Sequence, residues 1–545
     1  MTEFRSSLQP ESGLMRSNIT VAAGTAMSRI TGLIRIVIFG IVIGQTALAD
    51  AFDAANNAPN AVYELLIGGV LSASLVPLFT QYLEDDDHDA TDSIISVTLV
   101  ALVVCTALAM LAAPMIFHIF SLNPATNIDI VQFRHAGTLL TRIFLVQIFF
   151  YGLSALASAL LNARRRFFAA AWSPVLANCV TIGFLLLIPL TTIDDPPSLL
   201  DVINRPVFKW LLGLGSTAGV GAMAITMFIA VRRSGIALRF KPHLAHPAVR
   251  RLISLSLWTF GYVAANQLAL VVIKNLASPG SGNVDAYSKA MILLQLPYGL
   301  LAVSIATTFV PDLARFVTRN DLAGFSEHMT RGVRLTALFT FPAAAGLLVL
   351  SRPIIGLVLQ HGNFSATASD NTSRALQGLA IGLIGFSLYL FALRGFYAHN
   401  DTRTPFFINL CENILNIAFA FMLVGRYGVL GLGIAFSLAY LISAVLALII
   451  LHRKILSFNS LRVLRSLWTI ALSSLVMAIV VRFSTGFVGS DAGFGALSRV
   501  IVGIAIGCII YWLLLTIFKV GELQILSRWK SNSGKSNMTS TDEHH

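Results

Sequence analysis

Long apolar stretches separated by short polar connections constrain the fold of this chain more than any other feature. An α-helix needs about 20 apolar residues to cross the hydrocarbon core of a bilayer, and fourteen stretches of the sequence reach or approach that length. Charged residues make up 12% of the 545 residues, whereas a soluble domain carries roughly 25%. The sequence therefore predicts an all-α polytopic membrane protein with about fourteen transmembrane helices.

The predicted spans are residues 15–43, 47–82, 91–118, 132–162, 167–190, 207–231, 250–276, 285–316, 333–358, 373–398, 405–425, 429–451, 462–484 and 495–519. Pro59, Pro297 and Pro342 lie inside spans, where proline can kink a helix. No connection is long enough to form a separate domain. We expect residues 520–545 to be a disordered cytoplasmic tail, because the stretch from Ser531 is polar and low in apolar residues.

The distribution of basic residues predicts the orientation of the spans. Alternate connections are rich in arginine and lysine, such as Arg164–Arg166 and the segment 232–251, whereas the opposite connections, such as 191–207, are poor in them. Basic connections face the cytoplasm, and both termini fall on this side. The acidic run Glu84–Asp89 also falls on the cytoplasmic side, an exception that the rule tolerates because acidic residues count little.

A weak internal repeat divides the chain into two halves. A polar turn leads into Pro174 and Asn178 in the first half, and six spans later a similar turn leads into Pro405 and Asn409. An offset of six spans preserves orientation, so the repeats predict two pseudo-symmetric six-helix lobes whose substrate site lies between them near the midplane. The expected organisation is a cytoplasmic segment 1–14, lobes at 15–231 and 250–451 joined by a cytoplasmic linker 232–249, two extra transmembrane helices in 462–519, and the tail 520–545.

Arg29 and Arg35 lie inside the first span, about 9 Å apart along a helix axis. An arginine near the bilayer centre costs at least about 2.5–3.5 kcal/mol on insertion scales, so both need compensation. They could snorkel or pair with an acidic residue, or they could face an internal site for an anionic ligand. Guanidinium groups suit phosphate in particular, because their fork of N–H donors matches phosphate oxygens.

Other charges in the spans have similar alternatives. Asp50 opens the second span and is either a functional acid or a salt-bridge partner or cap at the membrane interface. Glu64 lies deeper in the same span and could pair with an arginine. Lys274, at the outer end of the seventh span, is expected to snorkel, and Lys289, in the eighth, either snorkels or faces a cavity.

The eleventh span carries a polar stripe. Asn409, Glu412 and Asn416 are three, four and seven residues apart and share one face of a helix, beside Asn413. Oxygen ligands of this kind could bind a coupling cation or a proton, or the stripe could be an interhelical hydrogen-bond network.

Several function classes lack support in the sequence. The four cysteines lie far apart without Cys-x-x-Cys or Cys/His spacing, so we expect no metal or redox site. The formal charge of +12 comes from basic residues between spans, which argues against nucleic acid as a partner. We expect no catalytic residues and no cofactor beyond a possible coupling ion or the membrane potential.

A series of short motifs runs through the chain. In order they are Ser28-Arg29-Ile30-Thr31-Gly32-Leu33-Ile34-Arg35, Asp50-Ala51-Phe52, Pro59-Asn60, Gly69, Ser72, Val76-Pro77, Gln295-Leu296-Pro297, Gly299, Gln360-His361-Gly362-Asn363-Phe364, Gly395-Phe396-Tyr397 through Asp401, and Thr404-Pro405. Together they resemble the signature of the MurJ/MviN family of lipid II flippases. The match runs in order through the membrane region to about residue 520.

The resemblance implies a transporter of the multidrug/oligosaccharidyl-lipid/polysaccharide export superfamily. It would have a cationic cavity between two lobes and a hydrophobic groove formed by the last two spans. Its implied task is to move lipid II, the undecaprenyl-diphosphate-linked peptidoglycan precursor, from the inner to the outer leaflet of the bacterial cytoplasmic membrane by alternating access, for cell-wall synthesis. Arg29, Arg35 and Asp50 correspond to the family's substrate-binding residues, and Asn60 belongs to the Pro-Asn motif.

The chain also departs from the family pattern. Further arginines of the second and eighth spans are replaced here by Tyr63 and by Met291-Ile292, so Lys274 and Lys289 become candidate substitutes. The seventh span lacks the acid that some members use for sodium, which leaves sodium, proton and membrane potential open as energy sources.

Two alternatives remain at this stage. The chain could be another exporter of the superfamily, either a polysaccharide-lipid flippase or a cation-coupled drug antiporter, although the latter should favour acidic cavity residues. A membrane glycosyltransferase would need catalytic carboxylates or a metal, commonly on a large loop, and the outer connections here are short. We expect a monomeric transporter with lipid II and membrane lipids as its partners.

Overall fold

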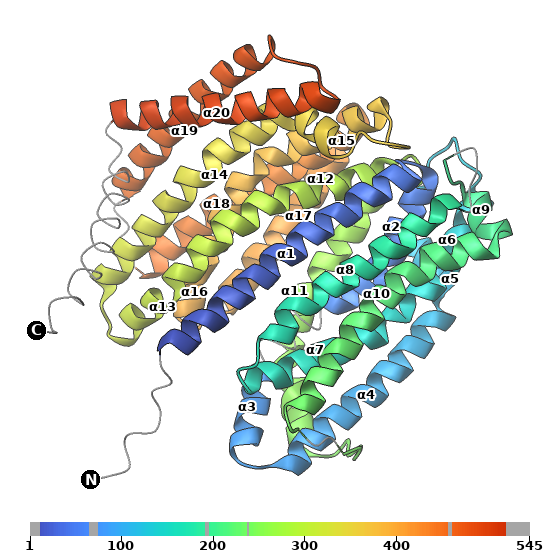
Figure 1. The fold of residues 1–545 in the computed structure, drawn as a ribbon. Coiled ribbons are helices and arrows are strands. Elements are labelled where there is room, and N and C mark those ends of the chain that lie inside the picture. The colour runs from blue at the N-terminus through green and yellow to red at the C-terminus, as the bar shows by residue number, and fades with distance from the viewer. Residues whose placement is uncertain (1–10, 65–74, 191–195, 237–238, 456–459, 519–545) are drawn as a thin grey trace, which may run out of the picture. The chain divides into compact units, whose positions relative to one another are not determined.

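The computed structural model describes residues 11–64, 75–190, 196–236, 239–455 and 460–518, and every regular element among them is a helix (Figure 1). The chain forms two compact units. The first unit comprises Met1–Asp285 and His361–Ser365, and the second comprises Ala286–Gln360 and Ala366–His545.

Helices of the first unit begin with the long α1 and end with α11. In order they are α1 (Glu11–Ile43), α2 (Ala47–Glu64), α3 (Val76–Glu84), α4 (His88–Leu111), α5 (Ala113–Ile119), α6 (Ile130–Leu145), α7 (Gln147–Ala163), α8 (Phe168–Leu187), η2 (Ile188–Leu190), α9 (Leu199–Asn204), α10 (Pro206–Arg233) and α11 (Pro247–Leu276).

The helix α12 (Asn283–Pro297) starts in the first unit and continues into the second. The remaining helices are η3 (Tyr298–Val303), α13 (Ser304–Thr318), α14 (Leu322–Val358), α15 (Ala366–Ala380), α16 (Gly382–Ala398), α17 (Arg403–Tyr427), α18 (Val429–Ile455), α19 (Ser460–Thr485) and α20 (Gly493–Ile517).

The prediction of an all-α polytopic membrane protein is confirmed. Among the described residues, 11 helices are long and apolar enough to cross a membrane, and the pair α15–α16, bent by 43°, makes up to 12. These correspond to twelve of the fourteen predicted spans. The second predicted span includes residues 65–74, which lie outside the described residues, and the seventh forms the 30-residue helix α11.

The in-span prolines act differently from one another. Pro297 ends α12 and is followed by η3, a π-helical segment of six residues. Proline lacks the backbone N–H that would continue the α-helical hydrogen bonds, and the helix changes to π-helical hydrogen bonding directly after it. Pro59 and Pro342, by contrast, lie inside α2 and α14, and neither helix ends there.

Close packing inside each unit holds the polar residues in place. In the first unit, aromatic rings of α2, α5 and α6 interlock: the ring centroids of Phe52 and Phe144 lie 5.0 Å apart, and those of Phe117 and Phe133 lie 5.4 Å apart. In the second unit, α15 and α18 approach at two glycines, because a Cβ on Gly378 would lie only 2.9 Å from the Cα of Gly433. Small residues allow such close helix contacts within membranes.

The acidic segment Glu84–Asp89, the exception to the predicted charge distribution, is partly neutralised within the first unit. The ammonium group of Lys241, in the basic linker, lies 2.6 Å from the carboxylate of Asp89, and Asp92 accepts a hydrogen bond of 3.0 Å from the backbone of Arg239. The compact units divide the chain after Asp285, whereas the repeat motifs divide it within the linker 232–249. Packing and internal repeats define the division of a chain in different ways, so the two lobes at 15–231 and 250–451 stay a prediction.

Candidate functional site

The helix that carries the two arginines is fixed to α8 along one face (Figure 1). Asn178 of α8 donates hydrogen bonds from its side-chain amide to the backbone carbonyl of Ser28, at 3.2 Å, and to the hydroxyl of Thr31, at 3.1 Å. Trp172 donates its indole N–H to the carbonyl of Thr20, at 3.2 Å. The motif around the arginines therefore contributes backbone and hydroxyl groups to helix packing and orients α1.

Neither Arg29 nor Arg35 of α1 is neutralised by an acidic residue of the described part of the chain. Arg29 is exposed and Arg35 is half-buried, and neither forms a hydrogen bond or an ion pair there. Glu64, the expected partner, is exposed at the end of α2 and forms no ion pair with a described residue. The alternative in which an acid compensates the arginines loses its support.

A polar cluster from α2 and α7 lies beside Arg35. The hydroxyl of Tyr151 donates a hydrogen bond of 3.2 Å to the side-chain carbonyl of Asn60 and interacts electrostatically with the Arg35 guanidinium. The ring of Tyr63 packs on that of Tyr151, with centroids 4.4 Å apart and planes at 39°. All four side chains are half-buried. The structure thus brings together Arg35 and Asn60, both predicted from the sequence, through two tyrosines.

Asp50 is completely buried and accepts three backbone hydrogen bonds. One carboxylate oxygen accepts from the N–H groups of Gly280 and Gly282, both at 2.8 Å, and the other accepts from the N–H of Asp285, at 2.9 Å. Asp285 lies in the first turn of α12, whose leading N–H groups lack partners within the helix. Of the two alternatives for Asp50, the geometry favours the cap; its role toward substrate stays a prediction.

Lys274 does not snorkel, so that expectation is wrong. Its side chain is 6% exposed, and the ammonium lies 2.5 Å from a carboxylate oxygen of Asp53. The same carboxylate accepts a hydrogen bond from Asn57 at 3.4 Å. The lysine is neutralised by this buried ion pair with Asp53 of the second span, so its ammonium group does not need to reach the membrane surface. Substrate binding by Lys274 stays a prediction, and the pair reduces the charge that it can offer.

The candidate residues of the second unit lie on α12 and α17. Lys289 of α12 is buried, 3% exposed, and has an interaction partner. On α17, Asn409, Glu412, Asn413 and Asn416 all lie on the buried face of the helix. Substrate binding by Lys289 stays a prediction.

Contacts of the α17 stripe are sparse. Asn413 donates its side-chain amide to the backbone carbonyl of Asn409, at 3.0 Å, within the same helix. Glu412 interacts electrostatically with Tyr287 of α12 but forms no hydrogen bond with a described residue, and the side-chain oxygen of Asn416 is buried without a partner. The Asn413–Asn409 hydrogen bonds lie within α17, and the Glu412 carboxylate and the Asn416 side-chain oxygen remain available to a ligand.

One motif of the resemblance has a structural explanation. Asn363 donates its backbone N–H to the carbonyl of Ile41, at 3.0 Å, and its side-chain amide to the carbonyl of Val42, at 2.8 Å. These carbonyls belong to the last turn of α1, where helical partners are missing. Gly362 has φ +57°, and a Cβ there would lie 2.7 Å from the Ile41 carbonyl oxygen. The segment therefore caps the helix that carries the arginines.

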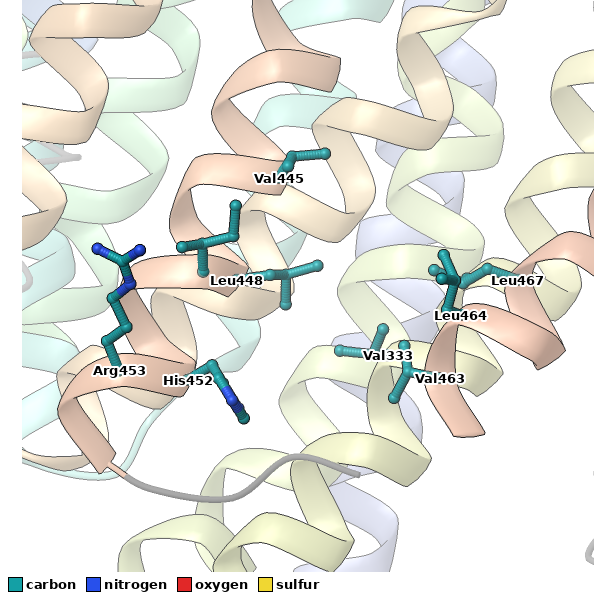
Figure 2. A pocket seen from close by; sticks show the side chains of 9 residues that line it. Val333, Val445, Leu448, His452, Arg453, Val463, Leu464 and Leu467 are labelled. Carbon is teal, nitrogen blue, oxygen red and sulfur yellow. The ribbon is translucent and has the colours of Figure 1, made fainter. Parts of the chain in front are cut away.

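A groove in the second unit has a different character. It lies between α18 and α19 with Val333 of α14 at its base, has a volume of about 310 Å³, and is apolar except for His452 and Arg453 (Figure 2). Such a lining does not suit a sugar or a diphosphate. The described residues also contain no group of three or more His, Cys, Asp or Glu side chains that could hold a metal ion.

Sequence reasoning missed Tyr151 as a site residue. Tyr151 lies in the apolar sequence of α7, between Phe150 and Gly152, where an aromatic residue is usually interpreted as a lipid contact. A buried tyrosine hydroxyl normally has a hydrogen-bond partner, and this rule is the one signal that pointed to the cluster.

Comparison with known proteins gives a consistent result. A family model described as "Lipid II flippase MurJ" matches residues 40–530. Similar proteins include a "Probable lipid II flippase MurJ" of Rhizobium meliloti (strain 1021), 29% identical over 79% of each chain. A "Lipid II flippase MurJ" of Burkholderia cenocepacia is 28% identical over 81% of this chain and 84% of its own.

Solved structures agree on the fold. The structure "Lipid II flippase MurJ, inward closed conformation" has a TM-score of 0.76 and 24% identity, covering 92% of this chain and 98% of its own. An inward-facing multidrug resistance MATE transporter of the MOP superfamily has a TM-score of 0.64 and 10% identity, over 80% and 98%. The family match begins at residue 40, so the interpretation of Arg29 and Arg35 depends on their environment in the structure.

Proposed function

This chain belongs to the lipid II flippase MurJ family, and we propose that it moves lipid II from the inner to the outer leaflet of the bacterial inner membrane by alternating access. Family membership makes it a multi-pass transporter, and lipid II is the substrate that the names of its relatives support. The proposal adds a direction, a mechanism and a set of residues.

The physical problem is to carry a diphosphate and a bulky polar headgroup across hydrocarbon while the polyprenyl tail stays in lipid. A charged group in a low-dielectric medium is very costly unless cations and polar groups compensate it. The observation that carries the proposal is the pair Arg29 and Arg35, two cations in a span without an acidic partner among the described residues. We assign them to the diphosphate, which would supply the missing countercharge.

The assignment is tested in cells depleted of their own flippase. Surface-labelled lipid II is measured after complementation with the wild-type chain, with the double variant Arg29→Ala/Arg35→Ala, and with Arg426→Ala as a control. Arg426 is an exposed arginine of α17 that packs on Tyr427, 5.6 Å from its ring centroid. We expect loss of export only for the double variant at equal expression. Normal export by the double variant would overturn the role of the arginines.

We further propose that Glu412, with Asn409 and Asn416, binds a coupling cation or a proton. Support comes from a buried carboxylate without a hydrogen bond to a described residue and a buried amide oxygen without a partner. Hard cations prefer such oxygen ligands. Export by Glu412→Gln is compared with wild type in the presence and absence of a membrane potential and of a sodium gradient. If the variant responds to every gradient like wild type, the stripe has no coupling role.

Orientation and oligomeric state complete the proposal. The basic connections support a cytoplasmic location for both termini, and we propose a monomer as the transporting species. The cytoplasmic location of the termini is tested by labelling single cysteines, introduced at residues 5 and 540, with an impermeant reagent in intact and in permeabilised cells. Reagent that reaches these positions without permeabilisation would contradict it.

A further inference from the structure

The side chains beside Arg35 present hydrogen-bond donors and few free acceptors. The Tyr151 hydroxyl donates a hydrogen bond of 3.2 Å to the Asn60 side-chain carbonyl and interacts electrostatically with the Arg35 guanidinium. The Tyr151 proton therefore points to Asn60, and the guanidinium, which offers only donors, does not compete for it. This arrangement fixes the orientation of the Asn60 amide.

An amide whose carbonyl accepts from Tyr151 must direct its NH₂ group elsewhere. Neither that NH₂ group nor the hydroxyl of Tyr63 has a hydrogen-bond acceptor among the described residues. Together with the Arg35 guanidinium, three donor groups from α1 and α2 are therefore available at half-buried positions. Leaving polar groups unpaired in a low-dielectric site is costly, and an acceptor-rich ligand would remove that cost.

Charge limits which ligand this cluster can complete. A diphosphate has more oxygens than two arginines can satisfy, and a third cation beside Arg35 would add like-charge repulsion. Neutral donors supply hydrogen bonds without that repulsion, and bonds to a charged acceptor are the stronger kind. Glu64 interacts electrostatically with Tyr63, but it is exposed, so solvent screens its charge, and neighbouring helical residues point about 100° apart.

We propose that Asn60 and Tyr63 complete the diphosphate site of Arg35 as neutral donors, and that Tyr151 is the positioning residue that orients the Asn60 amide. The cluster selects a diphosphate over a monophosphate, because the second phosphoryl group takes the additional donors. The inference rests on the proposed function and extends it to residues that carry no charge.

Binding of two defined probes by the full-length protein in lipid nanodiscs tests the selectivity. The probes are undecaprenyl diphosphate and undecaprenyl monophosphate. Asn60→Ala and Tyr63→Phe should each weaken binding of the diphosphate by roughly tenfold and leave binding of the monophosphate within about twofold. Arg35→Gln should weaken both probes. Equal losses for both probes in Asn60→Ala and Tyr63→Phe, or no loss, would overturn the inference.

The positioning role of Tyr151 has its own readout. Tyr151→Phe keeps the ring on Tyr63 and removes the hydroxyl, so it should reproduce the selective loss of Asn60→Ala. Because it acts through the amide, Tyr151→Phe/Asn60→Ala should bind no more weakly than Asn60→Ala alone. An additive double variant would contradict this role. Tyr427→Phe, a tyrosine of α17 outside the cluster, serves as the control and should bind like wild type.

The outcomes also separate this inference from the proposed function. If the wild-type protein exports lipid II but the variants keep its probe selectivity, only the inference fails. If wild type neither exports lipid II in the depletion assay nor binds the diphosphate probe, the proposed function fails. A folding defect is recognised independently, because it lowers binding of the monophosphate as well.

Discussion

Removing the Asp50 carboxylate should destabilise the protein before it affects transport. Asp50→Ala leaves three backbone N–H groups without their acceptor, those of Gly280, Gly282 and Asp285. A buried donor without a partner costs about 1–3 kcal/mol, so the three sum to roughly 3–9 kcal/mol, toward the lower end if water enters. Asp50→Asn keeps one oxygen and should cost about 1–3 kcal/mol.

The assay combines stability with transport. The midpoint of thermal unfolding is measured for both variants in detergent, and export is measured in depleted cells at matched protein levels. We expect the midpoint to fall in the order wild type, Asp50→Asn, Asp50→Ala, and export per folded molecule to fall much less. A wild-type midpoint together with abolished export would refute the cap and make Asp50 a substrate-binding residue.

Three further results are expected. Lys274→Met removes the ammonium group that pairs with the Asp53 carboxylate and should cost about 3 kcal/mol of stability, most of which the double variant Lys274→Met/Asp53→Asn regains in thermal unfolding. Partial burial alone would raise the pKa of Asp401, but its hydrogen bonds with Lys454 and Thr404 outweigh this effect and lower the pKa to about 2. The resulting stabilisation is present above a pH of about 4 and is lost as the pH falls toward 2. The stability of Asp401→Asn should therefore depend less on pH between these values, as measured by thermal unfolding. Gly362→Ala should lower the unfolding midpoint, because φ +57° and the contact with the α1 carbonyl both disfavour a Cβ; an unchanged midpoint would contradict the cap on α1.

The membrane architecture could be predicted from the sequence because it depends on local composition. A span needs only enough consecutive apolar residues, and periodicity within a span suffices to place Asn409, Glu412 and Asn416 on one face. The distortion at Pro297 follows from the same kind of local rule, although its form as a π-helical segment does not.

Partners that come from distant segments could not be predicted in this way. Lys274 meets Asp53 across 221 positions of the chain, and Tyr151 meets Asn60 across 91. No pattern within a single span specifies which helix packs beside it. For the same reason the sequence leaves the Asp50 alternatives open, because its three backbone donors lie on the α11–α12 connection and in the first turn of α12, 230 to 235 positions along the chain.

The contrast between Lys274 and the two arginines supports one interpretation of α1. Where a membrane cation has a structural role, as at Lys274, the fold supplies a carboxylate 2.5 Å away. Outside the spans, the ammonium of Lys454 likewise lies 2.8 Å from the carboxylate of Asp401. Arg29 and Arg35 are treated differently, since no described acid neutralises them even though α8 and residue 363 fix the helix that carries them. A rigidly held helix with uncompensated guanidinium groups is costly in the empty protein, and it becomes favourable when an anion arrives. Anion binding therefore relieves the unfavourable free energy of the two unpaired guanidinium groups. Replacing both arginines by neutral residues should raise the midpoint of thermal unfolding and abolish export.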